Sequence, residues 1–125
     1  MNEKSNTMIG LSENGHSKLK ILKEDGIFHE MVDGYRAGVA FAIASNERPV
    51  PISGKKQTTF SVGTVDRKLA VSTLVQTLLD VDDSEVYAII EQLAEIGVQK
   101  FYHEYEETGN IDFIQMLKIF ESPSQ

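Results

Sequence analysis

The feature that most constrains the fold is the stretch at residues 28–46, which reads FHEMVDGYRAGVAFAIASN. Its large apolar side chains recur at the spacing of one helix face, so the sequence predicts an amphipathic helix here. Gly34, Gly38 and Ala42 follow one another every four residues on a neighbouring strip of that helix. A glycine costs a helix roughly 1 kcal/mol relative to alanine, and a strip without bulk is typical of a close helix crossing. The second helix belongs either to another copy of the chain or to the same chain.

The length and the composition set the broad class of the protein. A chain of 125 residues is expected to form a single domain, residues 1–125, with one core. Because the chain has no cysteine, disulfides, thiol nucleophiles and thiolate metal sites are excluded. The first residues lack the apolar run of a signal peptide, and the longest nearly apolar stretch, residues 37–44, is too short to span a bilayer. We therefore expect a cytoplasmic protein without a membrane partner.

The charges are distributed unevenly along the chain. The net charge is −7, made up of −1 for residues 1–48, +3 for residues 49–74 and −9 for residues 75–125. Non-specific binding to polyphosphate depends on an excess of lysine and arginine, which only the middle segment has. An anionic partner is therefore expected to contact the middle segment.

The N-terminal part predicts a short strand followed by a helix. Thr7, Ile9 and Leu11 alternate as in a strand, and Ser12 is a good helix N-cap. A strand of five residues needs a partner strand, and because none is evident nearby we expect pairing with a second chain. The alternative is an extended arm packed on the helices. Residues 13–24 then predict a helix that ends near Gly26.

The order strand, helix, turn, helix in IGLSENGHSKLKILKEDGIFHEMVDGYRAGVAFAI resembles the ribbon-helix-helix pattern of intertwined dimers. More narrowly, the run LKILKEDGIFHEMVDGYRAGVAFAI is similar to protein E, a small helical protein of bacterial DNA sulfur modification systems. The resemblance covers residues 8–46. It implies that Ile9 and Leu11 face a dimer core, whereas Asn6, Met8 and Gly10 face DNA. Of these three, only Asn6 has a side chain suited to reading base edges.

Residues 47–65, ERPVPISGKKQTTFSVGTV, predict a long loop. Its prolines end the preceding helix, and a loop of this length in a compact domain is usually functional or mobile. The pair Lys55 and Lys56 is the best candidate here for contact with phosphate or with an acidic partner, and the alternative is a solvated loop tip. Residues 58–65 are also compatible with a strand kinked at a glycine.

Residues 66–120 predict the C-terminal helices. The helix at 66–79 is apolar on two faces, which suits the middle of a bundle or an oligomer interface. Arg67 and Lys68 stand at its start, where the helix dipole disfavours cations, so a compensating anionic group is expected. The acidic run at 80–85 fits a capping box better than a calcium loop. A long helix follows, which Gly97 either divides or leaves continuous, and a last helix begins after Gly109.

The sequence offers no arrangement typical of catalysis. The chain has three histidines, His16, His29 and His103, and none has a second histidine three or four residues away. The Gly-Lys pair at 54–55 lacks the upstream glycine of a phosphate loop, because Pro49 stands there. We therefore expect no catalytic residue, no metal and no cofactor.

These observations combine into an all-α helical bundle of about five helices, with a short N-terminal strand and a front half like a ribbon-helix-helix protein. Its parts are a strand-helix-helix unit at 7–46, a long loop at 47–65 and the C-terminal helices at 66–120. The predicted function is that of a non-enzymatic, DNA-associated or regulatory accessory protein acting as a homo-oligomer. The predicted DNA contacts are Lys4, Asn6, Lys55, Lys56, Arg67 and Lys68. The predicted oligomer interface comprises Ile9, Leu11, Gly34, Gly38 and Ala42.

The alternative function is that of an acidic protein-interaction module. The segment at residues 101–107, FYHEYEE, combines aromatic and acidic side chains. Such a surface would bind a basic protein partner, as an adaptor or as an inhibitor.

Overall fold

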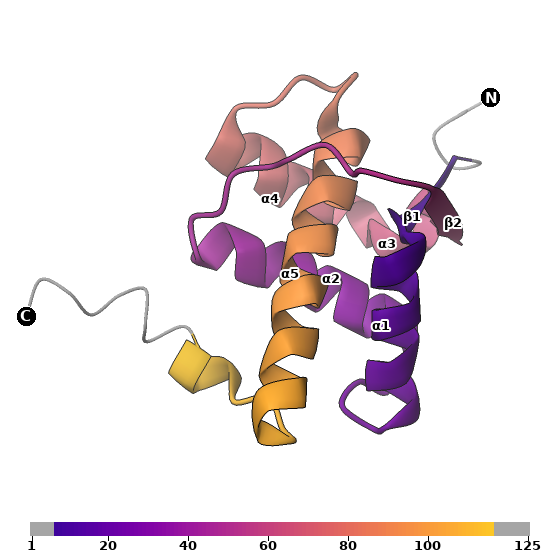
Figure 1. Cartoon of the computed structure of the whole chain (residues 1–125). Coiled ribbons are helices and arrows are strands. Elements are labelled where there is room, and N and C mark those ends of the chain that lie inside the picture. The colour runs from indigo at the N-terminus through magenta and orange to yellow at the C-terminus, as the bar shows by residue number, and fades with distance from the viewer. Residues whose placement is uncertain (1–6, 117–125) are drawn as a thin grey trace, which may run out of the picture.

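The computed structural model describes residues 7–116, which form a mainly helical fold with one small sheet (Figure 1). The sequence predicts an all-α bundle with one short strand; the mainly helical class is confirmed, and the structure adds a second strand. A further helical turn occupies residues 113–116. The elements in chain order are β1 (Met8–Ser12), α1 (Glu13–Glu24), α2 (Met31–Ala44), β2 (Lys56–Ser61), α3 (Val62–Val65), the 3-10 turn η2 (Arg67–Leu69), α4 (Ala70–Leu79) and α5 (Val86–Thr108).

The centre of the fold is the crossing of α2 and α5, which Figure 1 shows as one helix passing behind the other. A methyl group added to Gly97 would overlap the backbone of Gly38, and one added to Gly38 would lie 3.0 Å from the carbonyl oxygen of Ala94. The two backbones therefore approach closely because both helices have a glycine at the crossing. The small strip of α2 makes its contact inside one chain, and α5 continues through Gly97 without a break.

The partner of β1 is β2 of the same chain, in antiparallel register. Ile9 pairs with Phe60 and Gly10 pairs with Thr58, with a bulge between these two pairs. This corrects the expectation that β1 pairs with a second chain. It also shows that residues 47–65 are not a loop throughout, because they contain β2 and the turn α3.

The backbone of β1 is also tied to α5. The Gly10 amide donates to Oε2 of Glu91 at 3.0 Å, and the Ser12 amide donates to Oε1 of Glu95 at 3.0 Å. The Tyr35 hydroxyl donates to the Gly10 carbonyl oxygen at 2.9 Å. Because an amide has a single hydrogen to donate, these two amides have none to offer to a strand of another copy.

The interior consists of side chains from both strands and from the helices α1 to α5. Its aromatic part groups four rings, Phe28, Phe41, Phe101 and Phe113. The residues predicted as an oligomer interface also belong to this interior. All of them are buried by their own chain: Ile9, Leu11, Gly34, Gly38 and Ala42. A second copy cannot contact them without opening the core, so the predicted oligomer needs another surface.

None of the helices within residues 7–116 is both long enough and apolar enough to cross a membrane.

Candidate functional site

The exposed charge of residues 49–74 is entirely positive. Asp66, the only acid in this segment, is 4% exposed. Its Oδ1 accepts from the Ser72 amide at 2.9 Å, and its Oδ2 accepts from the Tyr87 hydroxyl at 2.6 Å. Burial, followed by the hydrogen bond to Asp66, raises the pKa of Tyr87 to about 12. The carboxylate is thus enclosed, and the side chains of this segment that project charge into water are cations.

Asp66 is also the anionic group expected near the start of α4. Its bond to the Ser72 amide places a negative charge at the positive end of the helix dipole. This arrangement offsets the unfavourable position of Arg67 and Lys68. The compensation therefore lies inside the chain, and the position of these cations does not by itself require a partner.

The junction before α4 has an unusual backbone. Lys68 and Leu69 both lie in the left-handed region, with φ values of 55° and 60°. For residues other than glycine, this conformation costs roughly 1–2 kcal/mol each. The junction leaves the side chains of Arg67, Lys68 and Leu69 exposed, next to the buried Asp66.

The adjacent lysines at the start of β2 have different roles. The Lys56 ammonium lies 2.9 Å from Oε1 of Glu91, whose carboxylate is almost fully buried. Lys56 therefore compensates a buried charge, a structural role in addition to the predicted contact with phosphate. The Lys55 ammonium lies 3.9 Å from Oε2 of Glu13, and both side chains are exposed. Since exposed ion pairs are weak, Lys55 is able to exchange this contact for a phosphate.

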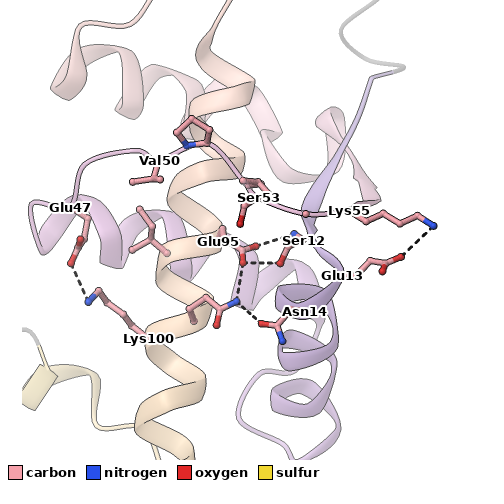
Figure 2. A pocket seen from close by; sticks show the side chains of 14 residues that line it. Ser12, Glu13, Asn14, Glu47, Val50, Ser53, Lys55, Glu95 and Lys100 are labelled. Carbon is pink, nitrogen blue, oxygen red and sulfur yellow. Dashed lines mark hydrogen bonds and ion pairs between the residues drawn. The ribbon is translucent and has the colours of Figure 1, made fainter.

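A groove of about 590 Å³ lies between the segment before β2 and the helices α1 and α5 (Figure 2). Glu95 faces it and accepts from the Ser12 amide and hydroxyl and from the Gln99 side chain. Lys100 pairs with Glu47 at 3.2 Å on the same wall. These polar side chains hold β1 and the residue 47–55 segment against α5. We therefore assign the polar side chains of the groove a structural role.

The acidic and histidine side chains of the described residues are not grouped as metal ligands would be. No set of three histidine, aspartate or glutamate side chains within residues 7–116 is placed to hold a metal ion. The Nδ1 atom of His16 lies 3.1 Å from the Thr59 hydroxyl, and burial, followed by the charge of Lys20, lowers the pKa of His16. This histidine links α1 to β2, which is a structural role.

The aromatic side chains of the segment at residues 101–107 make contacts within the chain, whereas Glu106 and Glu107 are exposed. Phe101 is fully buried among other phenylalanines, so it is not available to a partner, contrary to the interaction-module interpretation. The Tyr105 hydroxyl donates to Asp25 at 2.7 Å, and the Tyr102 hydroxyl donates to Glu106 at 3.2 Å. Of the three aromatic residues in that interpretation, Tyr102 and Tyr105 remain partly exposed.

The outer face of α4 is uncharged and exposed, and it carries Thr73 and Thr77 beside its apolar side chains. No residue of Ala70–Leu79 is charged, and only Ser72 and Val75 are buried. The exposed fractions are 61% for Leu69, 41% for Leu74 and 55% for Leu78. The sequence predicts two apolar faces for this helix, and the structure shows that one faces the interior while the other is open to water.

The remaining predicted DNA contacts, Lys4 and Asn6, lie outside the described residues. Comparison with known proteins adds no identity, because no protein family, no curated protein and no solved structure matches this chain.

Proposed function

We propose that this protein is a non-enzymatic, DNA-associated accessory protein that acts as a homo-oligomer, in line with its resemblance to protein E of DNA sulfur modification systems. The observation that carries the proposal is the purely cationic exposed charge of residues 49–74, whose only acid is buried and hydrogen-bonded. The phosphate contacts are Lys55, Arg67 and Lys68.

The proposed contact neutralises phosphates and does not read bases. In a ribbon-helix-helix protein the strand that enters the major groove has an open face. Here β1 pairs with β2, and its Gly10 and Ser12 amides donate to α5. Since β1 is held between these elements, binding is expected to be independent of sequence and sensitive to salt.

Gel-shift titration with duplex DNA at two salt concentrations tests the proposal. Replacement of Lys55, Arg67 and Lys68 by glutamate is expected to abolish the shift. In the single variants, the slope of log affinity against log salt should become less steep by roughly one, because one phosphate is no longer neutralised. The matched control is Lys23→Glu, which makes the same charge change at an exposed position of α1.

Two outcomes contradict the proposal. The first is an absence of binding by the unmodified protein at low salt. The second is an equal loss of affinity in the Lys23→Glu control, which would mean that net charge, and not the segment at 49–74, governs the interaction.

A further inference from the structure

We infer that two copies of this chain associate through α4, with their two α4 helices antiparallel about a two-fold axis near Leu74. The inference identifies the surface of the proposed homo-oligomer and so rests on that part of the proposed function. It requires no DNA.

The first argument is the composition of the exposed face. Ala70, Leu74 and Leu78 are spaced four residues apart, so they form one row along α4, and all three are exposed. Leu69, the residue just before the helix, is also exposed. An uncharged helix with an exposed row of leucines is typical of an association surface and not of a solvated face.

The second argument is the charge at the two ends of this row, which indicates what kind of partner packs on it. Arg67 and Lys68 are exposed at the N-terminal end of α4. Exposed acids follow its C-terminal end, namely Asp80, Asp82, Asp83 and Glu85. One end of the row is therefore positive and the other end is negative.

A second copy complements this surface in only one orientation. When two α4 helices pack antiparallel, each positive end meets the negative end of the other copy. A parallel arrangement would place like charges together, which is unfavourable at an interface. The same patch then serves both subunits, as in the isologous contact of a two-fold dimer.

The size of the contact sets the expected strength. A helix of ten residues is about 15 Å long, so the α4 pair buries less surface than a standard interface of roughly 1,600 Å². We therefore expect a reversible dimer whose population depends on concentration. The rim charges orient the two copies, and the leucine row supplies most of the attraction.

Sedimentation of the full chain without DNA, over a range of concentrations, tests the inference. The double variant Leu74→Glu with Leu78→Glu is expected to raise the dissociation constant at least tenfold. Both leucines are exposed, so folding should be retained, and circular dichroism checks this. The matched control is Ser17→Glu with Gln57→Glu, which adds the same charge at exposed positions of α1 and β2, outside α4.

A cysteine substitution tests the position of the axis. Because the chain has no cysteine, Leu74→Cys introduces a single thiol, and two thiols near the axis are expected to form an intermolecular disulfide on mild oxidation. Ser17→Cys, exposed on α1, is the control and should stay unlinked. A monomeric mass at every concentration, with Leu74→Cys unlinked, would show that another partner or residues 117–125 cover this face, and would overturn the inference.

Charge reversal tests the antiparallel orientation. Arg67→Glu with Lys68→Glu should weaken the dimer, as should Asp82→Lys with Asp83→Lys, and the four changes together should restore it. If the variant with all four changes dimerises as weakly as either double variant, the antiparallel orientation is wrong. Mass and gel shift separate the two proposals: a dimer that does not bind DNA contradicts the DNA role alone, and a monomer that binds DNA contradicts the α4 dimer alone.

Discussion

Glu91 joins the small sheet to the helices through one carboxylate. It is 6% exposed, its Oε2 accepts from the Gly10 amide at 3.0 Å, and its Oε1 accepts from the Lys56 ammonium at 2.9 Å. In the sequence this glutamate is indistinguishable from a solvated position of a helix, and Lys55 and Lys56 look equivalent. The partners lie far apart along the chain, so only the folded backbone reveals which lysine is structural and which is available to a ligand.

Glu91→Ala is expected to destabilise the fold by about 2–3 kcal/mol. The change leaves the Gly10 amide buried without its acceptor and removes the partner of Lys56, whose partial exposure moderates the loss. Urea unfolding monitored by circular dichroism measures the effect. Glu107→Ala, at an exposed position of the same helix, should change stability by no more than about 0.5 kcal/mol. Equal effects of the two variants would contradict the role given to Glu91.

Tyr87 provides a pH-dependent contact with Asp66. The pKa of its hydroxyl is about 12 in the folded state and 10.0 without the fold, so folding favours the protonated form. Its contribution to stability is complete below pH 10 and is lost as the pH rises toward 12. Tyr87→Phe should therefore unfold more easily at neutral pH, by about 1 kcal/mol, and its stability should fall less than that of the wild type over this alkaline range. If the free energy of unfolding in urea falls with pH equally in the wild type and in Tyr87→Phe, the role given to Tyr87 is wrong.

At the scale of elements, the sequence predicts the helices and their close crossing but not their partners. The glycine strip of α2 indicates a tight approach, because the absence of bulk is a local property. That the partner is Gly97 of α5 follows from the tertiary arrangement, and in the sequence the same glycine also fits a helix break. The strand β2 is hard to predict for another reason: only Phe60 among its six residues is buried, so it has almost no apolar alternation.

Gly97→Ala should force α2 and α5 apart, because the added methyl group would overlap the backbone of Gly38. We expect a loss of about 3 kcal/mol, since rigid backbone on a facing helix cannot move aside as a side chain does. The control is Gly63→Ala in α3, where a methyl group meets no atom within 4 Å. That variant should be neutral or slightly stabilised in thermal unfolding. An equally stable Gly97→Ala protein would contradict the close crossing.

At the scale of the whole molecule, the fold class could be predicted because helical periodicity is local, whereas the candidate surfaces required the structure. The sequence gives residues 49–74 a net charge of +3. It does not reveal that Asp66 is buried, which leaves only cations at the surface of that segment. Similarly, the sequence predicts two apolar faces for α4, but it does not show which of them is exposed to water. The open surfaces are therefore a cationic segment and an uncharged helix, which share Arg67 and Lys68 where they adjoin.

This division predicts that DNA binding and dimerisation respond differently to salt. The molecule as a whole carries −7, so its association with DNA rests on a few local cations and should be lost between roughly 50 and 200 mM salt. The α4 contact is mainly apolar, and salt does not weaken the burial of leucine, so the dimer should change little over the same range. Sedimentation and gel shift at both salt concentrations measure the two equilibria. If the mass falls to that of a monomer as the DNA complex dissociates, charge and not the leucine row holds the two copies together, and the assignment of α4 as an apolar interface is wrong.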